Sequence, residues 1–145
     1  VDGDVKATVD WVKKQAYANP DKLGITGFCW GGAVLWRNCM TDDGFKAGVA
    51  WYGGMTGLVE RAGDLTCPVL GLYGGTDARI ALTVPGTDSA MKALGRSYEH
   101  TIFPGAAHGF LRAQTQTDGS IMQANLDATK QAWPATIAWF RKYLK

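Results

Sequence analysis

The sequence has almost no net charge and no long apolar run. Its 15 basic and 13 acidic residues leave a net charge of +2, so the charge balance indicates neither nucleic acid nor a membrane surface as a partner. No apolar stretch approaches the roughly 18 residues that a membrane span needs. The first residues also lack the basic, apolar and small-residue pattern of a signal peptide. We therefore expect a cytoplasmic protein.

Cysteine and histidine are scarce as well. The chain has three cysteines, an odd number without a C-x-x-C pair, and two histidines. These counts argue against a disulfide framework and are typical of a reducing compartment. Their spacing matches no metal site, so we expect neither a metal nor another cofactor.

Apolar residues and glycine, by contrast, are abundant. Hydrophobic residues make up 46% of the 145 residues, which is enough for one core and a single domain over residues 1–145. The 19 glycines gather after apolar runs, as at residues 53–54, 74–75 and 105. Glycine is common there because tight turns follow the ends of strands.

Apolar runs and helical periodicities alternate along the chain. We predict strands at residues 22–28, 45–52, 68–73 and 97–103, and helices at residues 4–17, 30–40, 83–95 and 121–143. Pro134 is expected to kink or divide the last helix, and residues 55–66 hold a short helix at most. This alternation indicates an α/β fold, a parallel sheet of about four strands flanked by helices. Active sites in such sheets lie beyond the carboxyl ends of the strands.

Residues 24–32, G-I-T-G-F-C-W-G-G, predict a strand that enters a sharp turn with Cys29 at its apex. Gly27 and Gly31 take the flanking positions of a nucleophile elbow, where glycine lets the strand and the next helix pass closely. The helix that begins near Trp30 has a positive end that favours a thiolate, and the Trp30 N–H can donate to an oxyanion. The alternative is a structural cysteine in an ordinary glycine-rich turn.

Two residues at other strand ends are candidates for a base and an acid. His108 follows the fourth strand in a glycine-bordered loop, whereas His100 lies inside that strand and is interpreted as a surface or packing residue. Asp77 follows the third strand and can accept a hydrogen bond from His108, with a helix cap or turn as the alternative. Asp64 and Asp88 are weaker candidates, because one precedes its strand and the other lies in a predicted helix.

The motifs G-F-C-W-G-G, L-Y-G-G-T-D and F-P-G-A-A-H-G-F, followed by Arg112, resemble the dienelactone hydrolase (carboxymethylenebutenolidase) family of α/β-hydrolases. The order nucleophile, acid, base is that of this superfamily. The resemblance implies that Cys29 is the nucleophile, Asp77 the acid and His108 the base. It also implies that Arg112 holds a substrate carboxylate, for which a guanidinium offers a bidentate fork. A solvated loop charge is the alternative for Arg112.

The resemblance covers only the C-terminal part of the longer domain of this family, a partial α/β-hydrolase fold. The N-terminal half of the usual sheet is missing, together with a loop N–H of the oxyanion hole, a glutamate at the thiol and a second carboxylate-binding arginine. Only the Trp30 N–H remains as an oxyanion donor. The strand before Cys29 would become an open edge of the sheet, and such edges tend to pair with a strand of another chain. We therefore expect a homo-oligomer that covers this edge or face, or a fragment that lacks its N-terminal partner.

The function that we expect is hydrolysis of an ester or a lactone, a small molecule that carries a carboxylate, through a Cys-His-Asp triad and an acyl-enzyme. Trp30, Tyr52 and Phe110 adjoin strand ends and are expected in the pocket wall, with core packing as an equal alternative. Two other functions stay open. One is a non-catalytic fragment or binding module that retains the elbow. The other is a glutamine-amidotransferase-like cysteine enzyme, which the residues after His108 disfavour because no glutamate follows it closely.

Overall fold

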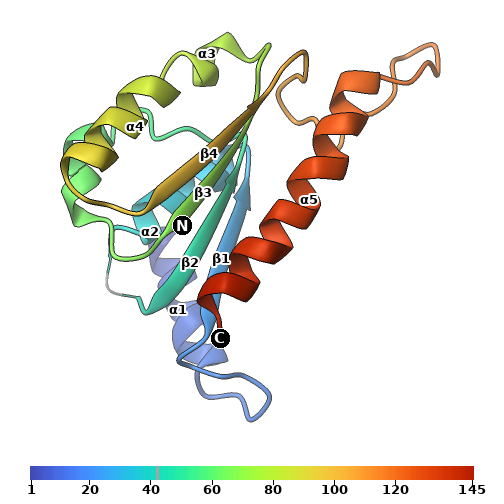
Figure 1. Ribbon diagram of the computed structural model, residues 1–145. Helices are drawn as coiled ribbons and strands as arrows, with labels where there is room; N and C mark the ends of the chain where they lie inside the picture. Colours follow the sequence, from blue (N-terminus) through green and yellow to red (C-terminus); the bar gives the residue numbers. More distant parts are fainter. Residues whose placement is uncertain (42) are drawn as a thin grey trace.

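The computed structural model describes residues 1–41 and 43–145, and its centre is a four-stranded parallel sheet (Figure 1). The strands, which pair in chain order, are β1 (Leu23–Phe28), β2 (Phe45–Trp51), β3 (Val69–Gly74) and β4 (Tyr98–Phe103). The predicted α/β fold is confirmed, and each predicted strand agrees with the structure to within a residue at either end. Because the strands are parallel, their carboxyl ends lie along one edge of the sheet.

Helices cover both faces of the sheet. The first face carries α1 (Asp2–Val12), α2 (Trp30–Asn38) and α4 (Val84–Ala93), while α5 (Gln123–Tyr143) lies along the other (Figure 1). Two short elements, the 3-10 helix η1 (Val59–Asp64) and α3 (Ala78–Ala81), lie in the connections before and after β3. No helix in the described ranges is long and apolar enough to cross a membrane.

Two of the predicted helices differ from the structure. The first was expected over residues 4–17 but already ends at Val12. The last was expected to be kinked or divided at Pro134, and it passes this residue undivided, as one helix. The buried residues Ala128, Ala132 and Trp139 anchor α5 to the sheet on both sides of Pro134. This packing holds the turns together although proline removes one hydrogen-bond donor.

The core has two layers because successive strand residues point to opposite faces. In β3, Val69 packs on the α2 side with Leu35, whereas Leu70 and Leu72 pack on the α5 side with Ala132. A strand that is buried on both faces needs apolar residues at every position. This explains the continuous apolar run of β3 and that of β2 after the exposed Lys46.

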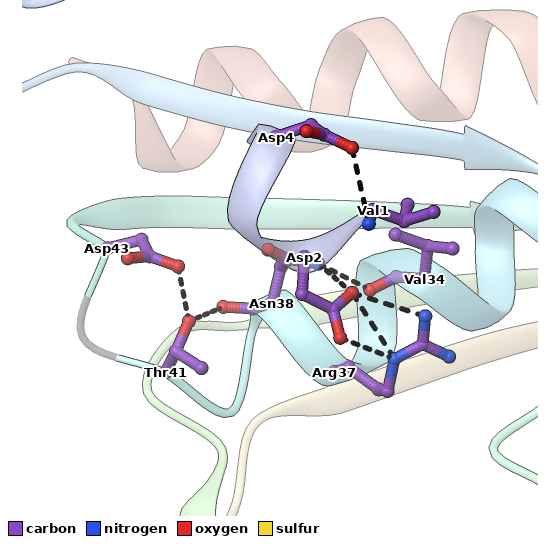
Figure 2. A network of polar contacts seen from close by, with 8 residues as sticks. All are labelled: Val1, Asp2, Asp4, Val34, Arg37, Asn38, Thr41 and Asp43. Atoms are coloured by element: carbon purple, nitrogen blue, oxygen red, sulfur yellow. Dashed lines mark hydrogen bonds and ion pairs between the residues drawn. The ribbon is translucent and has the colours of Figure 1, made fainter. Parts of the chain in front are cut away.

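A polar network joins the start of α1 to the end of α2 (Figure 2). The Arg37 Nε donates to Asp2 Oδ2 at 3.0 Å, and Asn38 Nδ2 donates to Asp2 Oδ1 at 3.3 Å and to the Val34 carbonyl at 2.9 Å. Asn38 is buried, so these bonds satisfy an amide that would otherwise be costly to bury. The hydrogen bond from Arg37 holds the pKa of the Asp2 carboxyl below its usual value.

The two outer strands of the sheet differ in their polarity. β4 carries Glu99 and His100, whereas β1, L-G-I-T-G-F, has no charged side chain. Beside β1, an apolar groove of about 490 Å³ lies between α1, β1 and α2, and its walls include Val5, Val9 and Ile25. Charged side chains protect exposed strands from pairing, so β1 is the less protected edge.

Candidate active site

Cys29 lies at the apex of the turn between β1 and α2. Its backbone has φ 56° and ψ −120°, a conformation that costs a non-glycine residue about 1–3 kcal/mol. The Cys29 N–H donates to the Trp51 carbonyl at 2.9 Å, which ties the turn to the end of β2. The side chain is exposed. The turn thus presents a thiol to solvent at the carboxyl edge of the sheet, as the sequence predicted.

The tight approach around this turn depends on glycine at two positions. A Cβ on Gly27 would lie 2.1 Å from the Gly31 carbonyl oxygen, and a Cβ on Gly32 would lie 2.9 Å from the Gly53 Cα. A Cβ on Gly31 would meet open space. The expectation that Gly27 and Gly31 both permit the approach is therefore wrong for Gly31, because only its carbonyl group faces the strand.

His108 and Asp77 lie in a chain of contacts with Cys29. The His108 Nε2 is 2.9 Å from Cys29 Sγ, and the His108 Nδ1 is 2.6 Å from Asp77 Oδ2. The side chain of Asp77 is only 8% exposed, while that of His108 is 33% exposed. The three groups come from the ends of β1, β3 and β4. This arrangement of a thiol, a base and an acid that orients the base can activate the thiol as a nucleophile.

Two polar residues that the sequence analysis did not single out hold the loops of this site. The buried Asn125 of α5 accepts from the Ala107 N–H at 2.8 Å and donates to the Ala113 carbonyl, so it fixes both ends of the His108 loop. Thr76, beside Asp77, donates from its hydroxyl to the Ala106 carbonyl at 2.9 Å. The sequence signal for Asn125 was weak, a single amide on the apolar face of a helix.

Tyr52 lies beside the thiol at the end of β2, with a positive φ of 40°. Its buried ring packs edge-on against His108 and Phe110, with centroid distances of 5.3 and 5.2 Å. Burial raises the pKa of Tyr52, Cys29 adds to the rise, and Arg112 opposes it. Tyr52, Cys29 and Arg112 line one cavity together.

Phe110, which we expected in the pocket wall, is fully buried. Its ring packs behind Tyr52 and against Trp51 and Phe103, as part of the core on the α5 side. Phe110 lines neither of the cavities that reach Cys29. It therefore supports the wall of the site from behind and does not form its surface.

Two cavities meet at the thiol and share Cys29, Tyr52 and His108 as walls. The first, of about 300 Å³, is otherwise lined by Phe28, Gly109, Arg112 and Ala113. The second, of about 210 Å³, is otherwise lined by Trp30, Ala33, Gly53, Gly54, Thr56, Arg79 and Ile80. The exposed Arg112 and the 62% exposed Trp30 thus border the site where we expected them.

The remaining candidates lie elsewhere. His100 stacks on Tyr98 with a centroid distance of 5.3 Å, and its Nδ1 is 3.8 Å from Asp88 Oδ1. Asp64 pairs with Arg61 at 3.0 Å. Within the ranges that the structure describes, no group of three histidine, cysteine or acidic side chains could hold a metal ion.

A parallel sheet with a cysteine in the elbow after β1, an aspartate after β3 and a histidine after β4 is the architecture of the α/β-hydrolases. The profile of the dienelactone hydrolase family matches residues 1–144, and the chain belongs to this family.

Relatives of this chain agree with the family. A protein of Methylorubrum extorquens named "Putative carboxymethylenebutenolidase" is 36% identical over 157 residues, which cover 97% of this chain and 50% of the relative. One of the same name from Escherichia coli O157:H7 is 35% identical, over 98% of this chain and 55% of the relative. The crystal structure of "Putative Dienelactone Hydrolase" from Klebsiella pneumoniae is similar with a TM-score of 0.83 and 33% identity, over 98% of this chain and 60% of that one. The chain thus spans about half the length of the curated relatives it matches.

Proposed function

We propose that the site hydrolyses carboxylic esters or lactones, with Cys29 as the nucleophile, His108 as the base and Asp77 as the group that orients His108. The observation that carries this proposal is the continuous contact from Cys29 Sγ through His108 to Asp77 Oδ2 at the mouth of two cavities. The names of the relatives, which refer to carboxymethylenebutenolidase, point to the same chemistry.

The proposed reaction has two halves. First, His108 Nε2 takes the thiol proton and the Cys29 sulfur attacks the ester carbonyl carbon, forming a C–S bond and an oxyanion. The oxyanion collapses, the C–O bond to the alcohol breaks, and His108 returns the proton to the departing oxygen. Then His108 takes a proton from water, the hydroxide oxygen attacks the thioester, and the C–S bond breaks. The thiol regains its proton and the acid is released.

Two groups assist these steps in the proposal. Asp77 accepts from His108 Nδ1, which fixes the tautomer and stabilises the imidazolium. The Trp30 N–H faces no acceptor within its own helix because Trp30 is the first residue of α2. It is therefore the proposed donor to the oxyanion.

The proposed substrate is a small ester or lactone that carries a carboxylate. The first cavity, about 300 Å³, is at the lower end of the range for ligand sites. Arg112 lines it and supplies a positive charge at its border. A guanidinium binds a carboxylate through two parallel hydrogen bonds.

A second candidate function is a non-catalytic binding module. The observation that favours it is that, among the described residues, Trp30 alone is assigned as an oxyanion donor, while the chain spans about half the length of its relatives. Loss of one such donor lowers turnover by about two to three orders of magnitude in a related acyl transfer. Membership of the dienelactone hydrolase family argues against the amidotransferase-like alternative.

The proposed location is the cytoplasm. All three cysteines are free in the structure. Free thiols are typical of reducing compartments.

The test is hydrolysis of para-nitrophenyl acetate by the purified chain, beside the variants Cys29→Ala and His108→Ala. We expect both variants to lose about three orders of magnitude or more in kcat. His100→Ala is the matched control, because this histidine lies on β4 away from the thiol and should leave activity unchanged. Full activity in Cys29→Ala would contradict the mechanism. No activity in the folded wild-type chain would favour the binding module.

A further inference from the structure

The mechanism above assigns no part of the substrate to the second cavity beside Cys29. It extends from the shared wall toward α2, the loop after β2 and α3, where Thr56 and Arg79 line it. The first cavity extends toward the α5 side, where Gly109 and Arg112 line it. The thiol therefore lies between two cavities, and each contains one arginine.

Arg79 is placed to bind an anion in this second cavity. Its side chain is 71% exposed, and its Nη2 is 3.8 Å from Asp77 Oδ2. The carboxyl of Asp77 thus attracts the guanidinium toward the site, but at a distance longer than a direct hydrogen bond. A guanidinium has five N–H donors, so this contact leaves donors available for a ligand. The Thr56 hydroxyl lines the same cavity.

We propose that Arg79 and Thr56 form a second anion-binding subsite, so that the preferred substrate carries an acidic group on both its acyl and its alcohol part. This inference rests on the proposed function. When Cys29 attacks an ester, the acyl part and the alcohol part extend from the carbonyl carbon in two directions. Each of the two cavities offers space for one of these parts. The volume of about 210 Å³ lies below the usual range for whole-ligand sites, so this cavity has room only for a small group, such as a short chain that ends in a carboxylate.

A purely supporting role for Arg79 makes a different prediction. If the guanidinium only positioned Asp77, its removal would lower the hydrolysis of every ester by the same factor, because the triad acts on all of them. A subsite instead discriminates between esters by their charge. The two roles are separated by comparing esters that differ only in where they carry a carboxylate.

The first experiment uses four phenyl esters: phenyl acetate, monophenyl succinate, meta-acetoxybenzoate, and the succinate monoester of meta-hydroxybenzoate. They carry no acid, an acid on the acyl part, an acid on the alcohol part, and both. We measure kcat/KM for the wild type, Arg79→Gln and Arg79→Lys. The matched control is Arg61→Gln, since Arg61 also pairs with an aspartate but lines neither cavity.

We expect Arg79→Gln to lower kcat/KM by about tenfold for the doubly charged ester and for one of the two singly charged esters. The neutral ester should change by less than about twofold, Arg79→Lys should retain part of the preference, and Arg61→Gln should resemble the wild type. An equal loss on all four esters would overturn the subsite in favour of a positioning role. No loss on any ester would overturn both roles.

The second experiment needs no turnover. Iodoacetamide alkylates Cys29 in the presence of increasing glutarate, a dicarboxylate, or of acetate. We expect the glutarate concentration for half protection to rise about tenfold in Arg79→Gln, with a smaller rise for acetate. Equal protection by glutarate in both proteins would overturn the subsite. A wild type that binds glutarate but hydrolyses none of the esters would instead refute the proposed function and leave the subsite standing.

Discussion

At the scale of single residues, Cys29 differs from the other two cysteines in its exposure and in its contacts. Cys29 is exposed and contacts His108, whereas Cys39 and Cys67 are buried in the core on the α2 side. The contact with Cys67 and burial together raise the pKa of the Cys39 thiol. Only one of the three cysteines therefore combines access to solvent with a neighbouring base.

The first prediction concerns thiol reactivity. Near neutral pH, iodoacetamide should alkylate Cys29 first and leave Cys39 and Cys67 protected, because reaction needs an accessible thiolate. Mass spectrometry of tryptic peptides over time measures the order. In urea, where the core is open, all three should react at similar rates. Equal and slow labelling of the three thiols in the folded protein would contradict the assignment of Cys29.

The second prediction concerns Asp77. Asp77→Asn should lower kcat for para-nitrophenyl acetate by about three to four orders of magnitude, because an amide does not hold His108 in the required tautomer. Asp88→Asn is a matched control, since Asp88 also faces a histidine, His100, at 3.8 Å. Circular dichroism checks that both variants fold. A similar loss in the two variants would show that the effect is not specific to the triad.

At the scale of elements, two junctions hold α2 in place: the elbow between β1 and α2 at its start, and the polar network between α1 and α2 at its end. The elbow depends on the close approach of Gly27 to the Gly31 carbonyl. The network depends on Asp2, which accepts from Arg37 and Asn38 (Figure 2). Both junctions involve α2, whose first turn follows Cys29 directly.

The third prediction compares two glycines of the elbow. Gly27→Ala should lower the free energy of unfolding by about 3 kcal/mol or more, because the new Cβ would meet the Gly31 oxygen at 2.1 Å. Gly31→Ala should be neutral or stabilise by about 0.5–1 kcal/mol, since a Cβ there meets open space within a helix. Urea unfolding measures both. A stable Gly27→Ala would mean that the strand and the helix are further apart.

The fourth prediction concerns pH. The pKa of Asp2 is lowered in the folded protein, so its contribution to stability is present above its unfolded value, near 3.8, and is lost as pH falls through the folded value. Asp2→Asn should lower the free energy of unfolding at neutral pH by at most about 1 kcal/mol, because the pair is partly exposed. Urea unfolding at neutral and acidic pH should show the difference vanish in acid.

The control for this prediction is Asp10→Asn. Asp10 has the same exposure, 52%, but pairs with Lys6 in its own helix and joins no second element. Its substitution should cost less than that of Asp2. An Asp2→Asn variant that stays less stable than the wild type in acid would show that the effect is not electrostatic.

At the scale of the whole molecule, the open edge of β1 and the apolar groove beside it have no partner within the described residues. The groove of about 490 Å³ runs along α1 and α2, and β1 carries no charged residue that would oppose pairing. Relatives hold further chain beyond the region that they share with this one. We propose that the purified chain covers this surface with a second copy.

The fifth prediction follows from this surface. Light scattering at micromolar concentrations should show a homo-oligomer, and Thr8→Lys, at the border of the groove, should weaken it. Thr101→Lys is the control, because Thr101 is also exposed but lies on β4. A well-folded wild-type monomer would contradict self-association. An effect of Thr101→Lys alone would place the contact on the other edge.

Much of the fold and part of the site could be read from the amino-acid sequence by itself. Strands buried on both faces leave continuous apolar runs, and helices leave a period near 3.6, so the four strands, their parallel direction and the flanking helices were all predictable. Parallel strands end at one edge of the sheet, and this brought Cys29, Asp77 and His108 to the same place. These properties are local or follow from topology alone.

Only the tertiary structure decided which neighbours complete the site. It buries Phe110 behind Tyr52, uses Asn125 to hold the His108 loop, and aims Arg79 at a second cavity. It also keeps α5 in one piece through Pro134, by packing on both sides of it. Each of these outcomes depends on contacts between residues that are distant in the chain. Local periodicity and motif spacing carry no information about such contacts, because packing selects them only after the elements have come together.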